Sequence, residues 1–377
     1  MLLELLSRIL LWVAVGLIIW FILVRFIPRN YLTWFGGLVV LALLVVSFID
    51  TASPAVASIW RILSFPLYPL GAAVSLLAVS IYGGPKQKAT WSQVTWALVI
   101  LFFASLPLVG RYLVGQAEGS VQDAFDARRT LCEEVCPAII PEQSDLNDVL
   151  AVVVMGDSVD AVRQTVESPT QVDSSRDFNV SFEPRLIYSS ILYNELRARG
   201  SAPQMYVTAG PTLGNDEEKA DKTKALKQVL FYGGIRETDP NSENDDVVRV
   251  LDTGMAARPT AEQVKSSLEE QNLLTDADDP TPQENRIMLV APALSIRRTA
   301  LTFEQLDLNV IARPTDFYSQ GGQRSNDLLV QLSDVIPSVD GLRLTTRWWD
   351  ELLTTIYYFL RGWLPSFNVS WQEVVEI

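Results

Sequence analysis

Four long uncharged runs in the first third of the chain constrain its fold more than any other feature. They hold 16, 20, 24 and 22 residues and lie between Arg8 and Arg25, Arg29 and Asp50, Arg61 and Lys86, and Lys88 and Arg111. An α-helix rises about 1.5 Å per residue, so about 20 apolar residues cross the hydrocarbon core of a bilayer. The runs therefore predict four transmembrane helices, over residues 8–27, 30–50, 61–84 and 90–113.

The charged loops between these runs predict the orientation in the membrane. Arg25 and Arg29 lie in the first loop, and Lys86 and Lys88 lie in the third. Loops rich in Lys and Arg stay in the cytoplasm, so both termini and the rest of the chain face outward. We expect a multi-pass protein of the bacterial inner (plasma) membrane with a large periplasmic domain. An odd number of spans would reverse the side of that domain.

Charge divides the 377 residues into two parts. Residues 1–116 carry seven Lys/Arg and two Asp/Glu, a net charge of +5, and the remainder carries 23 and 42, a net charge of −19. An acidic domain without a basic stripe argues against nucleic acid as a partner. The chain has no histidine, which excludes Ser-His-Asp and Cys-His centres and every His-ligated metal site.

The chain's two cysteines, Cys132 and Cys136, lie in a segment over residues 117–147 that we interpret as a linker. On a helix this spacing places the thiols near the distance limit for a disulfide, so a local bridge and two free thiols both stay open. Two cysteines without histidine do not make a zinc site. We predict no metal site, and no pattern in the chain identifies a cofactor.

Residues 148–377 show alternating strand and helix patterns. The strands are expected at 149–154, 205–208, 247–251, 287–290 and 310–312, and the helices at 185–199, 219–232, 260–273 and 295–306. This alternation predicts a Rossmann-like three-layer domain with a parallel sheet. The apolar stretch around Trp348 to Trp363 predicts a C-terminal helix. It either covers one face of the sheet, the interpretation we favour here, or lies at the membrane surface.

Parallel sheets of this class bind ligands at the carboxyl ends of their strands, which selects candidate site residues. Gly156 and Gly210 let a phosphate approach, or simply form tight turns. Asp157 accepts from a ligand or is a turn residue. Arg297, at a helix start where a cation opposes the dipole, meets either an anionic ligand or a loop carboxylate.

The order of motifs resembles the YdcF-like family of bacterial envelope proteins. The motifs are VVVMGDS, RLIYSSILYNELRARG, MYVTAGP, LFYGGI, PTAEQV, LVAPALSIRRTALTF and RPTDFYS, over roughly residues 148–362. The resemblance implies a ligand site at the strand ends. The strand ends also place Thr208, Thr260 and Ser295 near this site, and the resemblance adds Arg185 and Glu262. The full set of candidate ligand-binding residues is Gly156, Asp157, Arg185, Thr208, Gly210, Thr260, Glu262, Ser295 and Arg297.

The departures from the family pattern limit the chemistry that the resemblance implies. Ser295 stands where the family has histidine, and Pro292 stands where it has a hydroxyl residue. A serine hydroxyl does not replace imidazole as a general base at neutral pH. Thr260 is most simply a helix N-cap, with Glu262 an acid in the first turn.

Three functions follow as expectations. The first is a membrane-anchored envelope-biogenesis protein whose outer domain binds a phosphorylated ligand, such as a polyprenyl phosphate or a peptidoglycan precursor. The second is a non-catalytic accessory or scaffold protein with a decayed pocket, whose partners are envelope-assembly proteins. The third is a transferase or hydrolase of envelope precursors. The lipid bilayer is an expected partner in all three.

Overall fold

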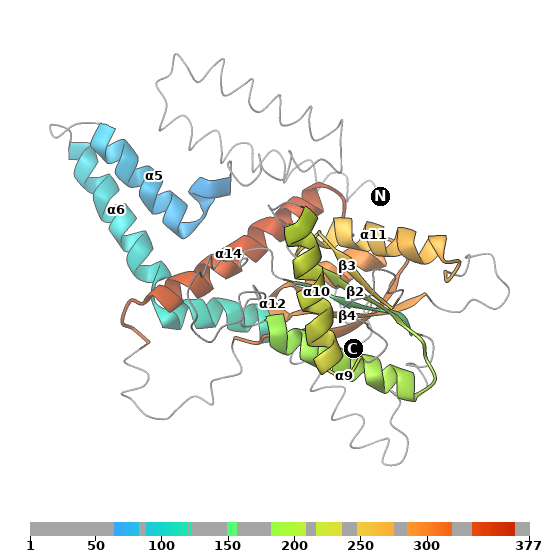
Figure 1. Cartoon of the computed structure of the whole chain (residues 1–377). Coiled ribbons are helices and arrows are strands. Elements are labelled where there is room, and N and C mark those ends of the chain that lie inside the picture. Colours follow the sequence, from blue (N-terminus) through green and yellow to red (C-terminus); the bar gives the residue numbers. More distant parts are fainter. Residues whose placement is uncertain are drawn as a thin grey trace, which may run out of the picture. The chain divides into compact units, whose positions relative to one another are not determined.

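The computed structural model describes residues 64–82, 88–119, 121, 149–156, 182–208, 216–235, 247–274, 285–318 and 334–365. The predicted spans 8–27 and 30–50, Cys132, Cys136, Asp157 and Gly210 lie outside the described residues. The chain divides into two compact units (Figure 1). One comprises Met1–Ala117 and Tyr318–Asn368, and the other comprises Glu118–Phe317 and Val369–Ile377. We call them the helical unit and the α/β unit.

The α/β unit is built on a five-stranded, all-parallel sheet in the order β3-β2-β1-β4-β5. The strands are β1 (Val149–Val154), β2 (Gln204–Thr208), β3 (Val248–Leu251), β4 (Arg286–Pro292) and β5 (Asn309–Thr315). The predicted Rossmann-like parallel sheet is therefore confirmed. In β1, five of six residues are buried, as expected for a parallel strand covered on both faces.

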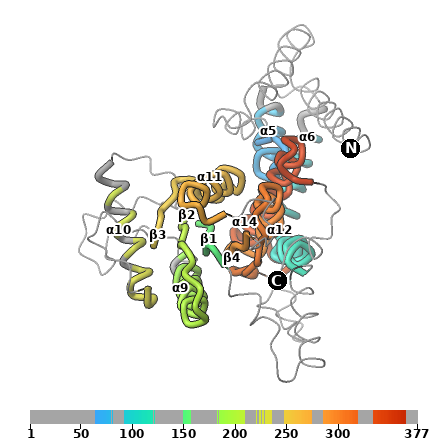
Figure 2. The backbone as a smooth tube through the Cα atoms, turned by 90° about the vertical axis from the view of Figure 1, so that its right-hand side faces the viewer, coloured from blue at the N-terminus to red at the C-terminus, as the bar shows by residue number. Residues whose placement is uncertain are grey.

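Helices connect and cover these strands. They are α9 (Phe182–Ala198), α10 (Asp216–Tyr232), α11 (Ala257–Glu270) and α12 (Ala293–Glu304). Helices α9 and α10 contact each other, as do α11 and α12, and the two pairs flank the sheet (Figure 2). A hydrophobic core joins the α9–α10 pair to the sheet through apolar side chains, including Leu186, Leu196, Val207, Leu226 and Leu230.

Glycine turns end two of these helices. Gly200 after α9 and Gly234 after α10 have φ angles of 93° and 105°, which glycine adopts at little cost. The next amide in each case bonds back into the helix, from Ser201 to Leu196 at 3.1 Å and from Ile235 to Leu230 at 3.1 Å. These are the bonds that close a helix C-terminus.

The start of α11 differs from the prediction. Thr260 was expected to cap this helix, but the cap residue is Ala256 and Thr260 lies one turn inside. The Thr260 hydroxyl lies 2.9 Å from the Ala256 carbonyl oxygen and 2.6 Å from the Thr253 hydroxyl. Pro259 fits in the first turn, where the helix does not need its missing N–H, so the helix extends further toward its N-terminus than the Pro-Thr pair indicated.

The helical unit contains η2 (Phe65–Leu67), α5 (Pro69–Tyr82), α6 (Lys88–Ala104) and α14 (Val339–Leu360). The predicted span over 90–113 is not one helix, because α6 ends at Ala104 and a second helix, Pro107–Gly119, follows at a 62° bend. Pro107 cannot donate the backbone bond that a continuous helix needs. Within the described residues no single helix is long and apolar enough to cross a bilayer, while this bent pair qualifies by length and composition.

Helix α14 belongs to the helical unit, which differs from the expected sheet-covering helix. Ser338 caps it, its side chain accepting from the Gly341 amide at 3.0 Å, and Gly362 follows its end with a φ of 74°. The Ser338 amide also donates to the Ser105 carbonyl at 2.8 Å. This partner lies more than 200 residues away, so the helical pattern of α14 alone did not indicate it.

Candidate functional site

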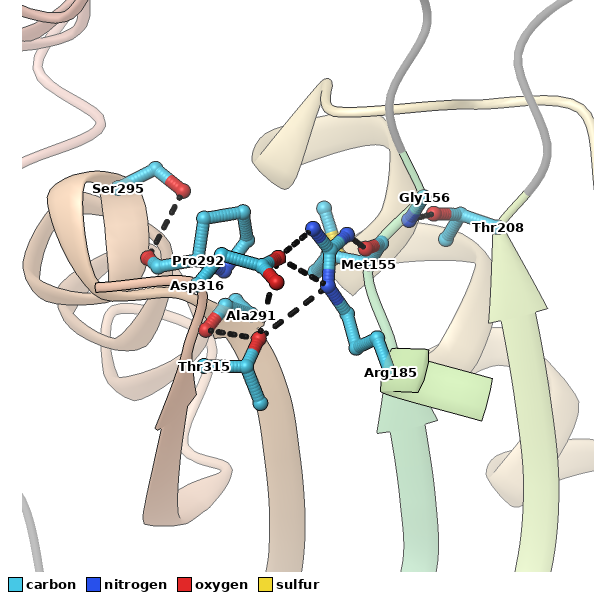
Figure 3. A network of polar contacts seen from close by, with 9 residues as sticks. All are labelled: Met155, Gly156, Arg185, Thr208, Ala291, Pro292, Ser295, Thr315 and Asp316. Atoms are coloured by element: carbon cyan, nitrogen blue, oxygen red, sulfur yellow. Dashed lines mark hydrogen bonds and ion pairs between the residues drawn. The ribbon is translucent and has the colours of Figure 1, made fainter. Parts of the chain in front are cut away.

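The candidate site lies at the carboxyl edge of the sheet, where the strand order reverses between β1 and β4. Connections leave these two strands in opposite directions along the sheet, and parallel α/β sheets commonly bind ligands at such a switch point. Met155 and Gly156 follow β1, Pro292 ends β4, and Asp316 follows β5. Figure 3 shows these residues converging with Arg185, which comes from the first turn of α9.

Arg185 is the centre of this polar network. Its side chain is 0% exposed. Its guanidinium forms an ion pair with Asp316, and its Nε donates to Asp316 at 3.0 Å and to the Thr315 hydroxyl at 3.2 Å. Another guanidinium nitrogen donates to the Met155 carbonyl (Figure 3). The Phe182 ring lies 5.7 Å from the guanidinium carbon, within the range of a cation–π contact.

The network ties three strands together. The Thr315 hydroxyl accepts from Arg185 and lies 3.3 Å from the Ala291 carbonyl of β4, to which it donates. Arg185 thus contacts the end of β1 directly and the ends of β4 and β5 through the Thr315–Asp316 pair. A buried guanidinium is tolerated only when its charge is compensated and its N–H groups are bonded. Asp316, the Thr315 hydroxyl and the Met155 carbonyl meet both needs.

Asp316 adopts a backbone conformation that supports this contact. Its φ is 53°, in the left-handed region that Asp and Asn enter more readily than most residues. Its side chain is 17% exposed, so the carboxylate borders solvent while the guanidinium does not. The sequence analysis missed Asp316 and Thr315 as site residues. Their signal was present, because both lie in RPTDFYS directly after the last strand.

Gly156 and Thr208 form a second contact at the same edge. The Gly156 amide donates to the Thr208 hydroxyl at 2.7 Å, and that hydroxyl donates to the Val154 carbonyl at 3.3 Å. A Cβ atom at Gly156 would lie 2.1 Å from the Thr208 carbonyl oxygen. Glycine is required here by the close approach of the ends of β1 and β2.

The remaining described candidates are distributed over two helices. Ser295 is buried in the first turn of α12, and its hydroxyl donates to the Pro292 carbonyl at 3.3 Å. Arg297 follows on the second turn, half-buried and outside the network drawn in Figure 3. Glu262 is directed to the surface, where it pairs with Arg258 at 2.6 Å. Thr260 is engaged within α11.

Two of the described candidates are engaged by other groups of the chain. The positive charge of Arg185 is compensated by Asp316, and the Ser295 hydroxyl is bonded to a backbone carbonyl. Among the described residues, no group of three or more Cys, Asp and Glu side chains is placed to hold a metal ion. The first turn of α12 lies at the same edge, because this helix begins at Ala293 directly after β4, and it has no side-chain cap.

The chain matches no protein-family model, no curated protein and no solved structure. The resemblance to the YdcF-like family therefore rests on the motifs quoted above.

Proposed function

We propose that this chain is a membrane-anchored protein of cell-envelope biogenesis whose α/β unit binds a phosphorylated ligand at the carboxyl edge of its sheet. One observation carries the proposal: the strand order reverses between β1 and β4, and α12 begins directly after β4 at that switch point with its first turn uncapped by any side chain. Free N–H groups at a helix N-terminus, together with the helix dipole, favour an anionic group.

The roles of the two arginines differ in this proposal. Arg185 supports the site, because its guanidinium is buried and its charge is compensated by Asp316. Arg297 is half-buried on the second turn of α12 and is the residue assigned to the ligand's phosphate. A charge-assisted bond from a guanidinium to phosphate is among the stronger polar contacts in proteins. The ligand class is a polyprenyl phosphate or a peptidoglycan precursor, as the resemblance to envelope proteins implies.

Calorimetric titration of the full chain in detergent with inorganic pyrophosphate and with a polyprenyl phosphate tests this assignment. We expect Arg297→Ala to weaken binding by about tenfold or more, the loss of one charged hydrogen bond. The matched control is Arg258→Ala, which removes an arginine of α11 that pairs with Glu262 at the surface. Equal affinity of wild type and Arg297→Ala contradicts the assignment.

A second function is favoured by a different observation. At the carboxyl edge the Gly156 amide, the Arg185 guanidinium and the Ser295 hydroxyl all bond to other groups of the chain. An edge whose polar groups are satisfied internally suits a non-catalytic accessory or scaffold protein that acts through envelope-assembly partners. Such a protein retains the fold of a binding domain without using its carboxyl edge.

Cells lacking the protein distinguish the two functions. Lipid-linked envelope precursors are measured by mass spectrometry after deletion and after rescue with wild type or Arg297→Ala. If the precursors accumulate and only wild type restores them, the carboxyl edge acts in envelope metabolism. If both restore them, the accessory function is the correct one. An unchanged precursor profile on deletion contradicts the role in envelope biogenesis.

A further inference from the structure

Within the helical unit, α14 crosses the open end of a helical hairpin. Helices α5 and α6 pack against each other and are joined by a short connection, so the start of α5 and the end of α6 lie at the same end (Figure 1). The Tyr68 hydroxyl, just before α5, donates to Asp350 of α14 at 2.7 Å. Just after α6, the Ser105 carbonyl accepts from the Ser338 amide at 2.8 Å. Both ends of the hairpin therefore contact the same helix.

The junction between α6 and α14 is closely fitted. The Leu108 amide donates to the Asp334 carbonyl at 3.0 Å, and the Arg111 guanidinium donates to both Asp334 carboxylate oxygens at 2.8 and 2.7 Å. A Cβ atom at Gly341 would lie 2.4 Å from the Ser105 carbonyl oxygen. Backbone groups freed where α6 breaks are thus bonded by the segment that leads into α14. This fit makes α14 an integral part of the helical unit.

The outward faces of the hairpin are apolar. No charged residue occurs between Arg61 and Lys86 or between Lys88 and Arg111. Its exposed large side chains include Leu70, Val74, Leu77, Trp96, Leu98, Phe102 and Phe103. A helix in water exposes polar side chains on its free face, whereas a helix that is apolar all round is covered by protein or lipid. With 14 and 17 residues, α5 and α6 are about 21 and 26 Å long, so each is long enough to enter the hydrocarbon core but shorter than its thickness of about 30 Å.

The same exposure of apolar side chains continues at the open end of the hairpin. Tyr112 is 64% exposed, Ile336 is 64% exposed and Val339 is 82% exposed, and Leu108 and Val335 beside them are also exposed. These five residues lie within five positions of Arg111 or Asp334 in the sequence, and these two form an ion pair. Exposed aliphatic and tyrosine side chains next to a paired arginine are typical of the membrane–water interface. There the apolar side chains contact lipid and the charged groups stay in water.

The other end of α14 has an interfacial composition as well. The Arg361 guanidinium lies 5.0 Å from the Trp363 ring centroid and 5.7 Å from that of Tyr357. Tryptophan, tyrosine and arginine concentrate at the level of the lipid headgroups because their side chains combine apolar surface with polar groups. Both ends of this 22-residue helix therefore suit the same environment.

We propose that α14 lies along the membrane surface, across the open end of an inserted α5–α6 hairpin. Leu108, Tyr112, Val335, Ile336 and Val339 then contact lipid at the interface. The inference rests on the membrane anchoring included in the proposed function and adds a second attachment. The α/β unit is then an insertion between two membrane-bound segments, held at both ends rather than at one. The partner of this surface is the lipid bilayer itself.

Quenching by brominated lipids tests the inference. The full chain with Cys132→Ser and Cys136→Ser carries single cysteines labelled with a bimane fluorophore, one variant each for Ile336→Cys, Val339→Cys, Leu98→Cys and Tyr232→Cys. Leu98 reports the α6 face of the hairpin, and Tyr232, exposed at the end of α10, is the water-facing control. The protein is reconstituted in phosphatidylcholine vesicles whose acyl chains are brominated close to the headgroup. An unchanged tryptophan emission spectrum verifies that each variant is folded.

We expect labels at Ile336 and Val339 to be quenched about as strongly as the label at Leu98, and the label at Tyr232 to keep its full emission. Quenching at Leu98 without quenching at Ile336 and Val339 overturns the inference and leaves the hairpin anchor intact. Emission at all four positions equal to that at Tyr232 overturns both the anchor and the inference. Ligand binding by the α/β unit is measured separately by calorimetry, so its outcome does not depend on this experiment. Should the cysteine-free background fail to fold, a photo-crosslinking amino acid at the same positions reports lipid contact instead.

Discussion

Among the described residues, each unit contains a long-range arginine–aspartate pair, and the two pairs differ in their surroundings. Arg185 and Asp316 meet at the carboxyl edge of the sheet with side chains 0% and 17% exposed. Arg111 and Asp334 meet beside the break after α6 with side chains 58% and 19% exposed. The first pair replaces water around a buried charge, whereas the second stays hydrated. Similar ion pairs therefore differ in what they do. The Arg185–Asp316 pair holds the edge of the sheet together, whereas the Arg111–Asp334 pair connects the segment before α14 to the helix after α6.

Removing Arg185 should have the largest effect. Arg185→Ala leaves Asp316 without its compensating charge and breaks bonds to the ends of β1 and β5, so we expect a loss of about 3–5 kcal/mol. Hydrogen–deuterium exchange of peptides from β1, β4 and β5 measures this loss locally. Asp316→Asn is the matched variant, because Asn also tolerates the positive φ of this position. If protection of these strands is unchanged in Arg185→Ala, the pair does not hold the edge.

Gly156→Ala should have the next largest effect in the α/β unit. The added methyl group would lie 2.1 Å from the Thr208 carbonyl oxygen and 2.9 Å from the Phe182 ring, so backbone must move. Overpacking of this kind costs about 1–3 kcal/mol. Gly119→Ala is the control, since its Cβ meets nothing within 4 Å. Exchange of β1 and β2 amides measures the difference, and equal protection in the two variants would contradict the close approach of these strands.

In the helical unit, Gly341→Ala tests whether α14 docks on the helix break. Its Cβ would lie 2.4 Å from the Ser105 carbonyl and 2.8 Å from the Pro107 nitrogen, and the expected cost is about 1–3 kcal/mol. Every tryptophan except Trp371 belongs to the helical unit, so tryptophan fluorescence during urea unfolding reports this unit. We expect an earlier fluorescence transition with unchanged exchange in β1. Coincident shifts in both probes would show that the units do not respond separately.

The sequence predicted the α/β unit well because its information is local. Buried runs such as Val149–Val154 and glycine stops such as Gly200 each specify an element from neighbouring residues, and consecutive parallel strands follow a small set of topologies. The sheet and its helices were predicted in this way. The observed start of α11 lies three residues before the predicted one, because Pro259 is tolerated inside the first turn of a helix.

Contacts between distant segments could not be predicted in the same way. The predicted site did not include Asp316, because the sequence pattern of α9 does not indicate that Arg185 contacts the residue after β5. The docking of α14 depends on a free carbonyl at Ser105, which exists only because Pro107 breaks the helix. The periodicity of an amphipathic helix is the same whether the helix covers a sheet or lies on a membrane. The sequence of α14 therefore did not determine where this helix packs.

Removing the Arg111–Asp334 pair should have the smallest effect and sharpens the comparison most. Because Arg111 is 58% exposed, Asp334→Asn should cost only about 0–1 kcal/mol, and added salt should shrink the difference further. The corresponding change Asp316→Asn in the buried pair should cost more and depend little on salt. Urea unfolding at low and high ionic strength, followed by tryptophan emission for Asp334→Asn and strand exchange for Asp316→Asn, measures both. A salt-independent loss of several kcal/mol in Asp334→Asn would show that the junction excludes water, and the two pairs would then serve the same purpose.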